Sequence, residues 1–370
     1  MKKIAILATY VGEVNRGAET FVIEFVKRMK KHYDIDVFSL NSCHEIEQNI
    51  NTVKVKEDMI LKINRFLYKK NFLYKKMADK IYYLIPDVAF QKKFTKVVFK
   101  KYILNNEYDI IFPNNGIWGA KFSNKLREYK GIPYIYTGHG GIGTGERLIL
   151  KTNPNIYIAL TNKHLEWAKK YSGNVAKIYN GIDINKFLIE NESLSKEKVI
   201  LSVGALTEFK RHELTIDALS NLDSSYKLKI VGDGELKKKI GEYGLKKLGD
   251  RFDLIKVPYD QINNIYREAN LFVLPSLDEP FGIVYLEAMA SNLPIVAPDD
   301  DTRREIIGEA GLYCNCENSN EYSNAIIKAI NNEWGNLPLE RAKIFNWDNI
   351  IISYKEVIEE ILNGNSKSSK

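Results

Sequence analysis

Two carboxylates stand eight positions apart in the apolar segment "EPFGIVYLEAMA", residues 279–290. Pro280 and Gly282 mark a turn, so we expect Glu279 in a loop and Glu287 inside the helix that follows. The apolar run "ANLFVLPS" just before them predicts a buried strand. This order places both carboxylates at the carboxyl end of a strand, where α/β proteins bind ligands. The pair is a candidate ligand site, and two glutamates on a solvated helix face are the alternative.

A second polar cluster follows another predicted strand, in "SVGALTEFKRHE". Lys210 and Arg211 stand beyond Gly204, at the expected start of a helix. Cations are unfavourable at a helix N-terminus unless an anion lies between them. The pattern favours a site that stabilises charge on a leaving diphosphate, and a solvated helix start is the alternative.

Two positions in the first half of the chain are further candidates. Gly17 begins an expected helix after the first strand, where a glycine lets a ligand approach and the helix N-terminus favours a phosphate. A loop that merely turns the chain is the alternative there, and the dinucleotide fingerprint G-x-G-x-x-G is absent. His139 follows an apolar strand in "YTGHGG", which favours a role in a cleft. By contrast, His32, His44 and His164 have lysine or glutamate neighbours and are expected at the surface.

The sequence offers no recognisable pairing of a serine or cysteine with a histidine, no Asp-x-Asp and no His-rich cluster. Hydrolase and metalloenzyme classes are therefore disfavoured, and we expect no metal site. Cys43, Cys314 and Cys316 cannot form a disulfide framework, which favours a reducing cytosol. No apolar run approaches the length of a membrane-spanning helix. The N-terminal "MKKIAILATYVGEV" lacks a signal-peptide cleavage site and predicts a buried strand.

The elements that must position these residues alternate along the chain. Its 370 residues exceed what one core usually takes up, so two domains are expected. Apolar runs rich in Ile, Val and Tyr alternate with amphipathic stretches in both halves, which predicts βαβ units, parallel sheets and two doubly wound domains. A polar segment at residues 180–198 separates the halves. A nucleotide-sized ligand is expected in the cleft between the domains.

Basic residues gather between Lys54 and Lys101. That segment holds 14 Lys or Arg against 4 Asp or Glu, a charge of +10, so the rest of the chain sums to −3 for the total of +7. Interleaved Phe, Tyr and Leu are typical of helices on an anionic membrane surface, with aromatic rings in the headgroup layer. Ordinary amphipathic helices with solvated lysines are the alternative. No nucleic-acid-binding motif accompanies the charge.

Taken in order, the motifs resemble those of the family 4, or group 1, retaining glycosyltransferases with the GT-B fold. The matching strings are "NRGAET", "YNGID", "VGALTEFKRH", "IVGDGELKKKI", "LPSLDEPFGIVYLEAMASNLPIVA", "REIIGEAGLY" and "FNWDNI". The resemblance implies two Rossmann-like domains that face each other across a cleft. They are an N-terminal acceptor-binding domain over residues 1–180, completed by a C-terminal helix at 348–364, and a nucleotide-sugar-binding domain over 181–347. Residues 365–370 are expected to form a flexible tail.

The resemblance also assigns roles in the second domain. Glu279 resembles the family residue that contacts the transferred sugar. The backbone of Phe281, Gly282 and Ile283 is similar to the turn that holds sugar and phosphate oxygens. Glu287 resembles the carboxylate that accepts hydrogen bonds from the ribose hydroxyls.

Cationic and N-terminal positions follow in the same way. Lys210 resembles the family lysine on the donor diphosphate. The family arginine after the strand glycine is replaced by Ala205, and Arg211 is the candidate that supplies its charge. Gly17 is similar to the second glycine of the family's Gly-Gly loop, and His139 to the histidine that reaches the donor sugar.

The resemblance implies metal-independent transfer, without a cofactor and with retained anomeric configuration, from a UDP- or GDP-linked sugar. The expected acceptor is a lipid-linked or cell-surface glycan at the cytoplasmic membrane face, with a soluble sugar or small metabolite as the alternative. A nucleotide-sugar-binding subunit without turnover is a further alternative. A nucleic-acid partner is not expected.

Overall fold

The protein is described here by a computed structural model. The described residues are 1–12, 17–55, 86–114, 116–188, 198–258 and 261–367. They divide into unit 1, residues 1–179 with 350–370, and unit 2, residues 180–349. The first predicted domain boundary, after residue 180, lies one residue from the observed one. The second, before residue 348, lies two residues from the observed one.

Unit 1 is built on short parallel strands. They are β1 (Lys3–Leu7), β2 (Asp34–Ser39), β3 (Ile50–Thr52), β4 (Ile110–Pro113), β5 (Ile135–Thr137), β6 (Ile156–Ala159) and β7 (Val175–Lys177). The strand orders are β3-β2-β1-β4 in one sheet and β5-β6-β7 in the other. A parallel bridge from Ile111 to Tyr134 joins the two sheets. β1 is almost wholly buried and pairs with β2 and β4, which confirms the predicted N-terminal strand.

Unit 1 also contains helices between these strands and most of the last helix of the chain. They are α1 (Gly17–Met29), α3 (Pro86–Lys101), α4 (Gly116–Lys130), α5 (Thr144–Leu150), α6 (Asn162–Lys169) and the last helix α15 (Trp347–Lys367), with 3₁₀ turns η1 (His44–Asn49) and η4 (Ile103–Asn105). α1 buries one apolar face, as expected of an amphipathic helix. Tyr354 of α15 is fully buried in unit 1, with its ring centroid 5.4 Å from those of Phe21 and Phe25 on α1. α15 continues to Lys367, past the predicted start of the tail, and residues 368–370 lie outside the described part of the chain.

The prediction that the aromatic side chains between Lys54 and Lys101 face a membrane is partly wrong. In α3, Phe90, Phe94 and Phe99 are buried, and the last two belong to the core of unit 1. Burying a phenylalanine ring contributes roughly 1.5–3 kcal/mol, so these rings fill the core and the lysines of the opposite face remain in water. The rest of this prediction falls on residues 56–85, which lie outside the described ranges. None of the described helices has the length and apolarity to cross a membrane.

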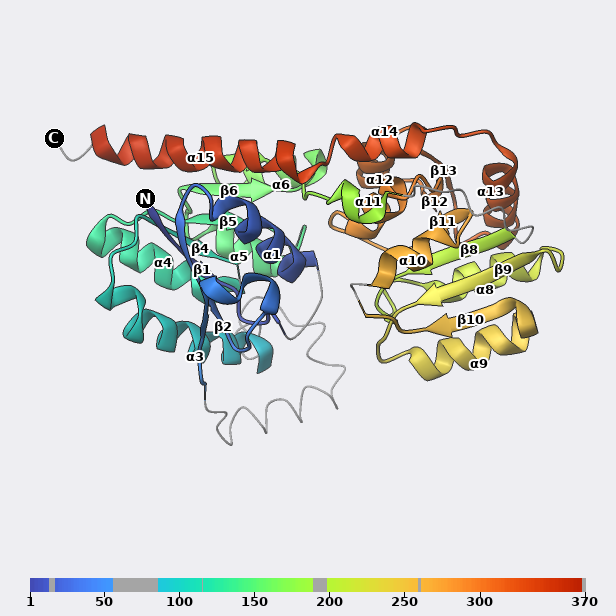
Figure 1. The fold of residues 1–370 in the computed structure, drawn as a ribbon, viewed down its shortest axis with the longest axis horizontal. Coiled ribbons are helices and arrows are strands. Elements are labelled where there is room, and N and C mark those ends of the chain that lie inside the picture. The colour runs from blue at the N-terminus through green and yellow to red at the C-terminus, as the bar shows by residue number, and fades with distance from the viewer. Residues whose placement is uncertain (13–16, 56–85, 115, 189–197, 259–260, 368–370) are drawn as a thin grey trace. The chain divides into compact units, whose positions relative to one another are not determined.

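Unit 2 holds a six-stranded parallel sheet in the order β10-β9-β8-β11-β12-β13 (Figure 1). The strands are β8 (Lys198–Val203), β9 (Tyr226–Val231), β10 (Phe252–Ile255), β11 (Leu271–Val273), β12 (Ile295–Pro298) and β13 (Gly311–Cys314). The helices are α7 (Ile184–Phe187), α8 (His212–Ser220), α9 (Lys237–Leu248), α10 (Ile262–Arg267), α11 (Ile283–Ala290), α12 (Asp301–Ile307), α13 (Ser319–Asn331) and α14 (Leu337–Lys343), with the 3₁₀ turn η5 (Gly249–Arg251).

In each unit the strand order reverses at one central strand. In unit 2 the chain runs from β8 outward to β9 and β10, and then returns to β11 on the other side of β8. In unit 1 the same reversal lies between β1 and β4. Such a reversal opens a crevice at the carboxyl ends of the strands, where α/β proteins bind ligands. The fold therefore brings the loops after β8 and β11 together in unit 2, and those after β1 and β4 together in unit 1.

Candidate active site

Lys210 and Glu279 form an ion pair in unit 2. Lys210 belongs to the loop after β8 and Glu279 to the loop after β11, so the pair joins the two loops at the reversal. Their side chains are 21% and 13% exposed. A partly buried cation and anion interact more strongly with a bound ligand than fully solvated ones. This pair can therefore bind a phosphate oxygen through the ammonium and a sugar hydroxyl through the carboxylate.

Two glycines lie beside the loop that carries Lys210, and only one of them is required there. The methylene groups of Lys210 lie against Gly204, where an added Cβ would stand 3.6 Å from them. A Cβ on Gly232, in the neighbouring loop after β9, would stand 2.0 Å from the Gly204 carbonyl oxygen. The close approach of the two loops therefore requires glycine at position 232, whereas a Cβ at position 204 would make only ordinary van der Waals contact with the lysine.

Arg211 is beside Lys210 in the chain, but its guanidinium is bound elsewhere. Its Nε donates to the Pro275 carbonyl at 2.7 Å, and its Nη1 donates to Glu317 Oε1 at 2.8 Å. The backbone of Arg211 is left-handed, with φ 51°, at the N-cap of α8. Arg211 thus fastens the loop that carries Glu279, and its contact with a diphosphate stays a prediction.

The turn before α11 is possible only with glycine. Gly282 has φ 85°, and an added Cβ would stand 2.5 Å from the Tyr285 ring and 3.2 Å from Glu279 Cγ. The Phe281 side chain is 2% exposed, so its backbone is the part that a ligand can reach. Ile283 begins α11, whose first N–H groups have no intrahelical partner and favour an anion.

Glu287 is buried, at 4% exposed, so the solvated-face alternative is wrong for this residue. The Tyr266 hydroxyl donates to Glu287 Oε2 at 2.7 Å. Tyr266 is fully buried and packs between the rings of Phe187 and Phe272, at centroid distances of 5.7 Å and 6.0 Å. The carboxylate is therefore held by a rigid phenol that the sequence pattern did not single out.

In unit 1, His139 lies beside the loop after β4 and the helix α1. Its Nε2 is 3.1 Å from Asn114 Oδ1, in the loop after β4, and its ring centroid is 4.7 Å from that of Phe21 on α1. Asn114 Nδ2 also donates to the Ala18 carbonyl at 3.3 Å, next to the exposed Gly17 at the start of α1. Burial, and to a smaller extent the charge of His164, lowers the pKa of His139 to about 3. His139 is therefore a neutral hydrogen-bonding group at neutral pH.

A buried polar network lies beneath the His139 loop. Glu146 Oε1 accepts from the Gly140 N–H at 2.9 Å, and its Oε2 accepts from the Tyr157 hydroxyl at 2.8 Å. His164 Nε2 lies 3.0 Å from the same hydroxyl, and His164 is 2% exposed. The predicted surface position of His164 is wrong, because the Thr161 cap accepts from its backbone N–H and the ring turns inward at the first turn of α6. The network supports the loop through the Gly140 amide.

The variant Glu146→Gln should change how stability depends on pH. Burial raises the pKa of Glu146 to about 7, from an ordinary 4.5, so the folded protein loses stability as pH rises through this range. The whole loss amounts to about 3 kcal/mol. Glutamine keeps an acceptor for Gly140 but does not ionise. In urea unfolding at pH 5 to 8, the free energy of unfolding of the variant should rise relative to that of the wild type as pH rises. A difference that stays constant over this range would contradict the burial argument.

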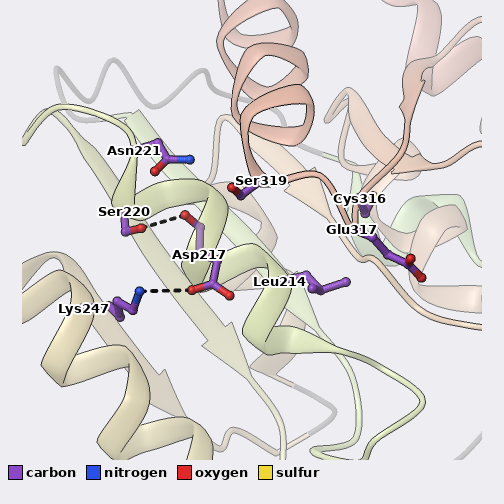
Figure 2. Close-up of a pocket in the computed structure, with 8 residues that line it drawn as sticks. All are labelled: Leu214, Asp217, Ser220, Asn221, Lys247, Cys316, Glu317 and Ser319. Carbon is purple, nitrogen blue, oxygen red and sulfur yellow. Dashed lines mark hydrogen bonds and ion pairs between the residues drawn. The ribbon is translucent and has the colours of Figure 1, made fainter.

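A separate pocket of about 240 Å³ lies on the α8 side of unit 2 (Figure 2). It is lined by Leu214, Asp217, Ser220, Asn221, Lys247, Cys316, Glu317 and Ser319. Lys247 Nζ is 3.4 Å from Asp217 Oδ1, so these charges compensate each other. Two lining residues contact the predicted site residue Arg211: Glu317 Oε1 accepts from its Nη1 at 2.8 Å, and the Leu214 N–H donates to its carbonyl at 3.0 Å. Within the described residues, no cluster of three or more His, Cys, Asp or Glu side chains is arranged to hold a metal ion.

Comparison with solved structures confirms the fold. The sucrose-phosphate synthase of Thermosynechococcus elongatus superposes with a TM-score of 0.76 at 19% identity, covering 98% of this chain and 100% of that one. The chain therefore has the predicted GT-B architecture of two Rossmann-like α/β domains.

Sequence comparison identifies relatives. A family model described as "Glycosyl transferases group 1" matches residues 183–345. An N-acetylgalactosamine-N,N'-diacetylbacillosaminyl-diphospho-undecaprenol 4-alpha-N-acetylgalactosaminyltransferase of Campylobacter jejuni is 33% identical over 152 residues, 39% of this chain and 40% of that protein. An uncharacterised glycosyltransferase of Methanocaldococcus jannaschii is 31% identical over 272 residues, 68% of this chain and 73% of that protein. With the fold and the family model, this last match shows that the chain belongs to the group 1 glycosyltransferases.

Proposed function

We propose that the chain transfers a sugar from a UDP- or GDP-linked donor to a hydroxyl of a lipid-linked or cell-surface glycan. Transfer retains the anomeric configuration and uses neither a metal ion nor a cofactor. The observation that carries this proposal is the partly buried ion pair of Lys210 and Glu279, held between the loops after β8 and β11. It supports the proposal because such a pair can present a cation to a diphosphate beside an acceptor for sugar hydroxyls.

In the proposed reaction, the bond between the sugar C1 and the diphosphate oxygen breaks while the acceptor oxygen forms its bond to C1 on the same face. The proton of the acceptor hydroxyl passes to the departing phosphate oxygen, so the nucleoside diphosphate leaves as the second product. Lys210 stabilises the charge that develops on this oxygen. Glu279 accepts hydrogen bonds from the sugar, which fixes C1 in position.

The other predicted residues hold the rest of the donor. Glu287, fixed by Tyr266, accepts hydrogen bonds from the ribose hydroxyls. The amides at Phe281, Gly282 and Ile283 bind sugar and phosphate oxygens. His139 is neutral at physiological pH, so it serves the donor sugar as a hydrogen-bonding group and not as a charge.

A shift in melting temperature tests the donor class. Purified protein is heated with UDP, GDP or ADP, because a ligand that binds the native state at a hundred times its Kd stabilises it by about 2.7 kcal/mol. UDP or GDP should raise the melting temperature, and Glu287→Gln should reduce the shift. If none of the three nucleotides shifts the transition, the proposed donor site is wrong.

The proposed location at a membrane rests on two observations. The Campylobacter relative is named for an undecaprenol-linked acceptor. On α3, Lys92, Lys96 and Lys100 are exposed at helical spacing, on the side away from the buried rings. We therefore place the protein at the cytoplasmic face of the cell membrane, where anionic lipids attract such a lysine face.

Binding to vesicles should follow salt and charge. Vesicles with 30% anionic lipid should bind the protein at 0.1 M salt and release it at 1 M, where the Debye length falls from about 10 Å to about 3 Å. Reversal of Lys92, Lys96 and Lys100 to glutamate should weaken binding more than reversal of Lys237, Lys238 and Lys246 on α9, which are also exposed. If the α3 and α9 variants weaken binding equally, or if the protein does not bind at low salt, the proposed membrane location is wrong and a soluble acceptor is favoured.

A further inference from the structure

The loop between β11 and α11, residues 274–282, is tied to its surroundings at four consecutive residues. The bonds are Tyr285 hydroxyl to Leu274 O at 3.0 Å, Arg211 Nε to Pro275 O at 2.7 Å, Arg303 Nη2 to Ser276 O at 2.6 Å, and Leu277 N to Phe209 O at 2.7 Å. This loop carries Glu279, so the position of its carboxylate depends on these four bonds.

The loop needs this support because its backbone is strained. Asp278 has φ 47° and Gly282 has φ 85°, so left-handed residues stand on both sides of Glu279. A non-glycine residue such as Asp278 adopts this region only where the surroundings impose it. A free loop would relax, and Glu279 would then lose its fixed position relative to Lys210.

Arg303, on α12, is the more deeply buried of the two arginines that donate hydrogen bonds to this loop. It is 3% exposed, and its Nη2 donates to both the backbone oxygen and the hydroxyl of Ser276, at 2.6 Å and 3.0 Å. Its Nη1 donates to Asp300 Oδ2 at 2.6 Å. The planar guanidinium thus joins the Glu279 loop to the start of α12 with fixed directions.

Stability alone gives no reason for a cation at this position. Apolar side chains of similar volume often replace buried ion pairs without loss of stability. Within the described structure, the Nε of Arg303 is buried without a hydrogen-bond partner, which is unfavourable. What arginine supplies here, and an apolar residue does not, is a pair of directed bonds to Ser276.

We propose that Arg303 is a positioning residue for the transfer reaction. It acts through Ser276 on the loop that places Glu279, and it does not touch the substrate. This inference rests on the proposed role of Glu279. It predicts that Arg303→Lys, which keeps the charge but loses the planar guanidinium with its directed N–H donors, lowers kcat by tenfold or more. Binding of UDP or GDP without a sugar should change by less than about twofold, because Glu279 is assigned to the sugar and not to the nucleotide.

The test is a double-mutant comparison. The kcat of Arg303→Lys is measured in the wild type and in the Glu279→Gln background, with circular dichroism and melting temperature as checks of folding. If Arg303 acts through Glu279, its tenfold effect should shrink to less than about threefold in the second background. Equal effects in both backgrounds, or weakened nucleotide binding, would mean a general structural role and overturn the proposal.

Two further outcomes separate this inference from the proposed function. If Glu279→Gln itself leaves both kcat and kcat/KM for the donor unchanged, the role assigned to Glu279 is wrong, and the positioning role of Arg303 is then wrong with it. If Glu279→Gln is impaired and Arg303→Lys is not, only the role of Arg303 is wrong. Where Arg303→Lys fails to fold, Ser276→Ala removes one acceptor of the guanidinium and keeps the rest. It should lower kcat three- to fivefold, again only when Glu279 is present.

Discussion

The variant Lys210→Ala is expected to release nucleoside diphosphate about a hundredfold to a thousandfold more slowly than the wild type. Removing one preorganised group that stabilises developing charge costs roughly this much in kcat. Lys210 is only 21% exposed, so bulk water screens its charge weakly. Initial rates with saturating donor and acceptor provide the measurement.

Two controls make this result specific. Lys238→Ala removes an exposed lysine from α9 and should keep the wild-type rate. Lys210→Arg keeps a cation but changes its geometry, so it should recover part of the lost rate. A rate for Lys210→Ala within threefold of the wild type would show that the leaving diphosphate takes no stabilisation from this residue.

The variant Glu279→Gln should lower kcat/KM for the donor by roughly 10- to 150-fold. Hydrogen bonds to a charged group are worth about 1.5–3 kcal/mol, and glutamine keeps the shape of glutamate without its charge. Nucleoside diphosphate without the sugar should bind no more weakly than to the wild type, because Glu279 is assigned to the sugar and its ion-pair partner Lys210 stays in place. The two effects are measured by steady-state kinetics and by titration calorimetry.

Glu242→Gln is the matched control, since Glu242 is exposed on α9 and should leave both quantities unchanged. If Glu279→Gln weakens nucleoside diphosphate binding as much as it lowers kcat/KM, the carboxylate does not discriminate the sugar. The division of roles between Glu279 and Glu287 would then be wrong.

The fold could be predicted because its signal is local. Short runs such as "KIAIL" and "YKLKIV" became buried parallel strands, and the amphipathic stretches between them became helices. Lys210 and Glu279 could each be predicted as a candidate site residue for the same reason. Each follows a strand, and the strand order brings their loops together at the reversal.

Contacts between distant segments could not be predicted. Arg303 is 27 positions from Ser276, and Tyr266 is 21 positions from Glu287, so no short motif connects the partners. Glu146 received no role from the sequence, because its importance arises from burial under the Gly140 amide. Such partners depend on side-chain packing, which hydrophobic periodicity does not encode.

The incorrect predictions have a common cause. His164 was placed at the surface because of charged neighbours, yet those neighbours point away while its own ring faces the core. The phenylalanines of α3 were taken for a membrane surface because lysines alternate with them, although an amphipathic helix on a sheet gives the same alternation. In both cases charged residues nearby in the sequence concealed a buried face.

The release of nucleoside diphosphate by the wild-type protein tests the central claim most directly. Purified protein is incubated with UDP- and GDP-linked sugars, with and without a panel of lipid-linked and soluble glycan acceptors, and the free nucleotide is quantified. We predict release that depends on both one donor class and an acceptor, and a product that keeps the anomeric configuration of the donor. Binding of a donor without release in the presence of any acceptor would contradict the account and identify a nucleotide-sugar-binding protein instead.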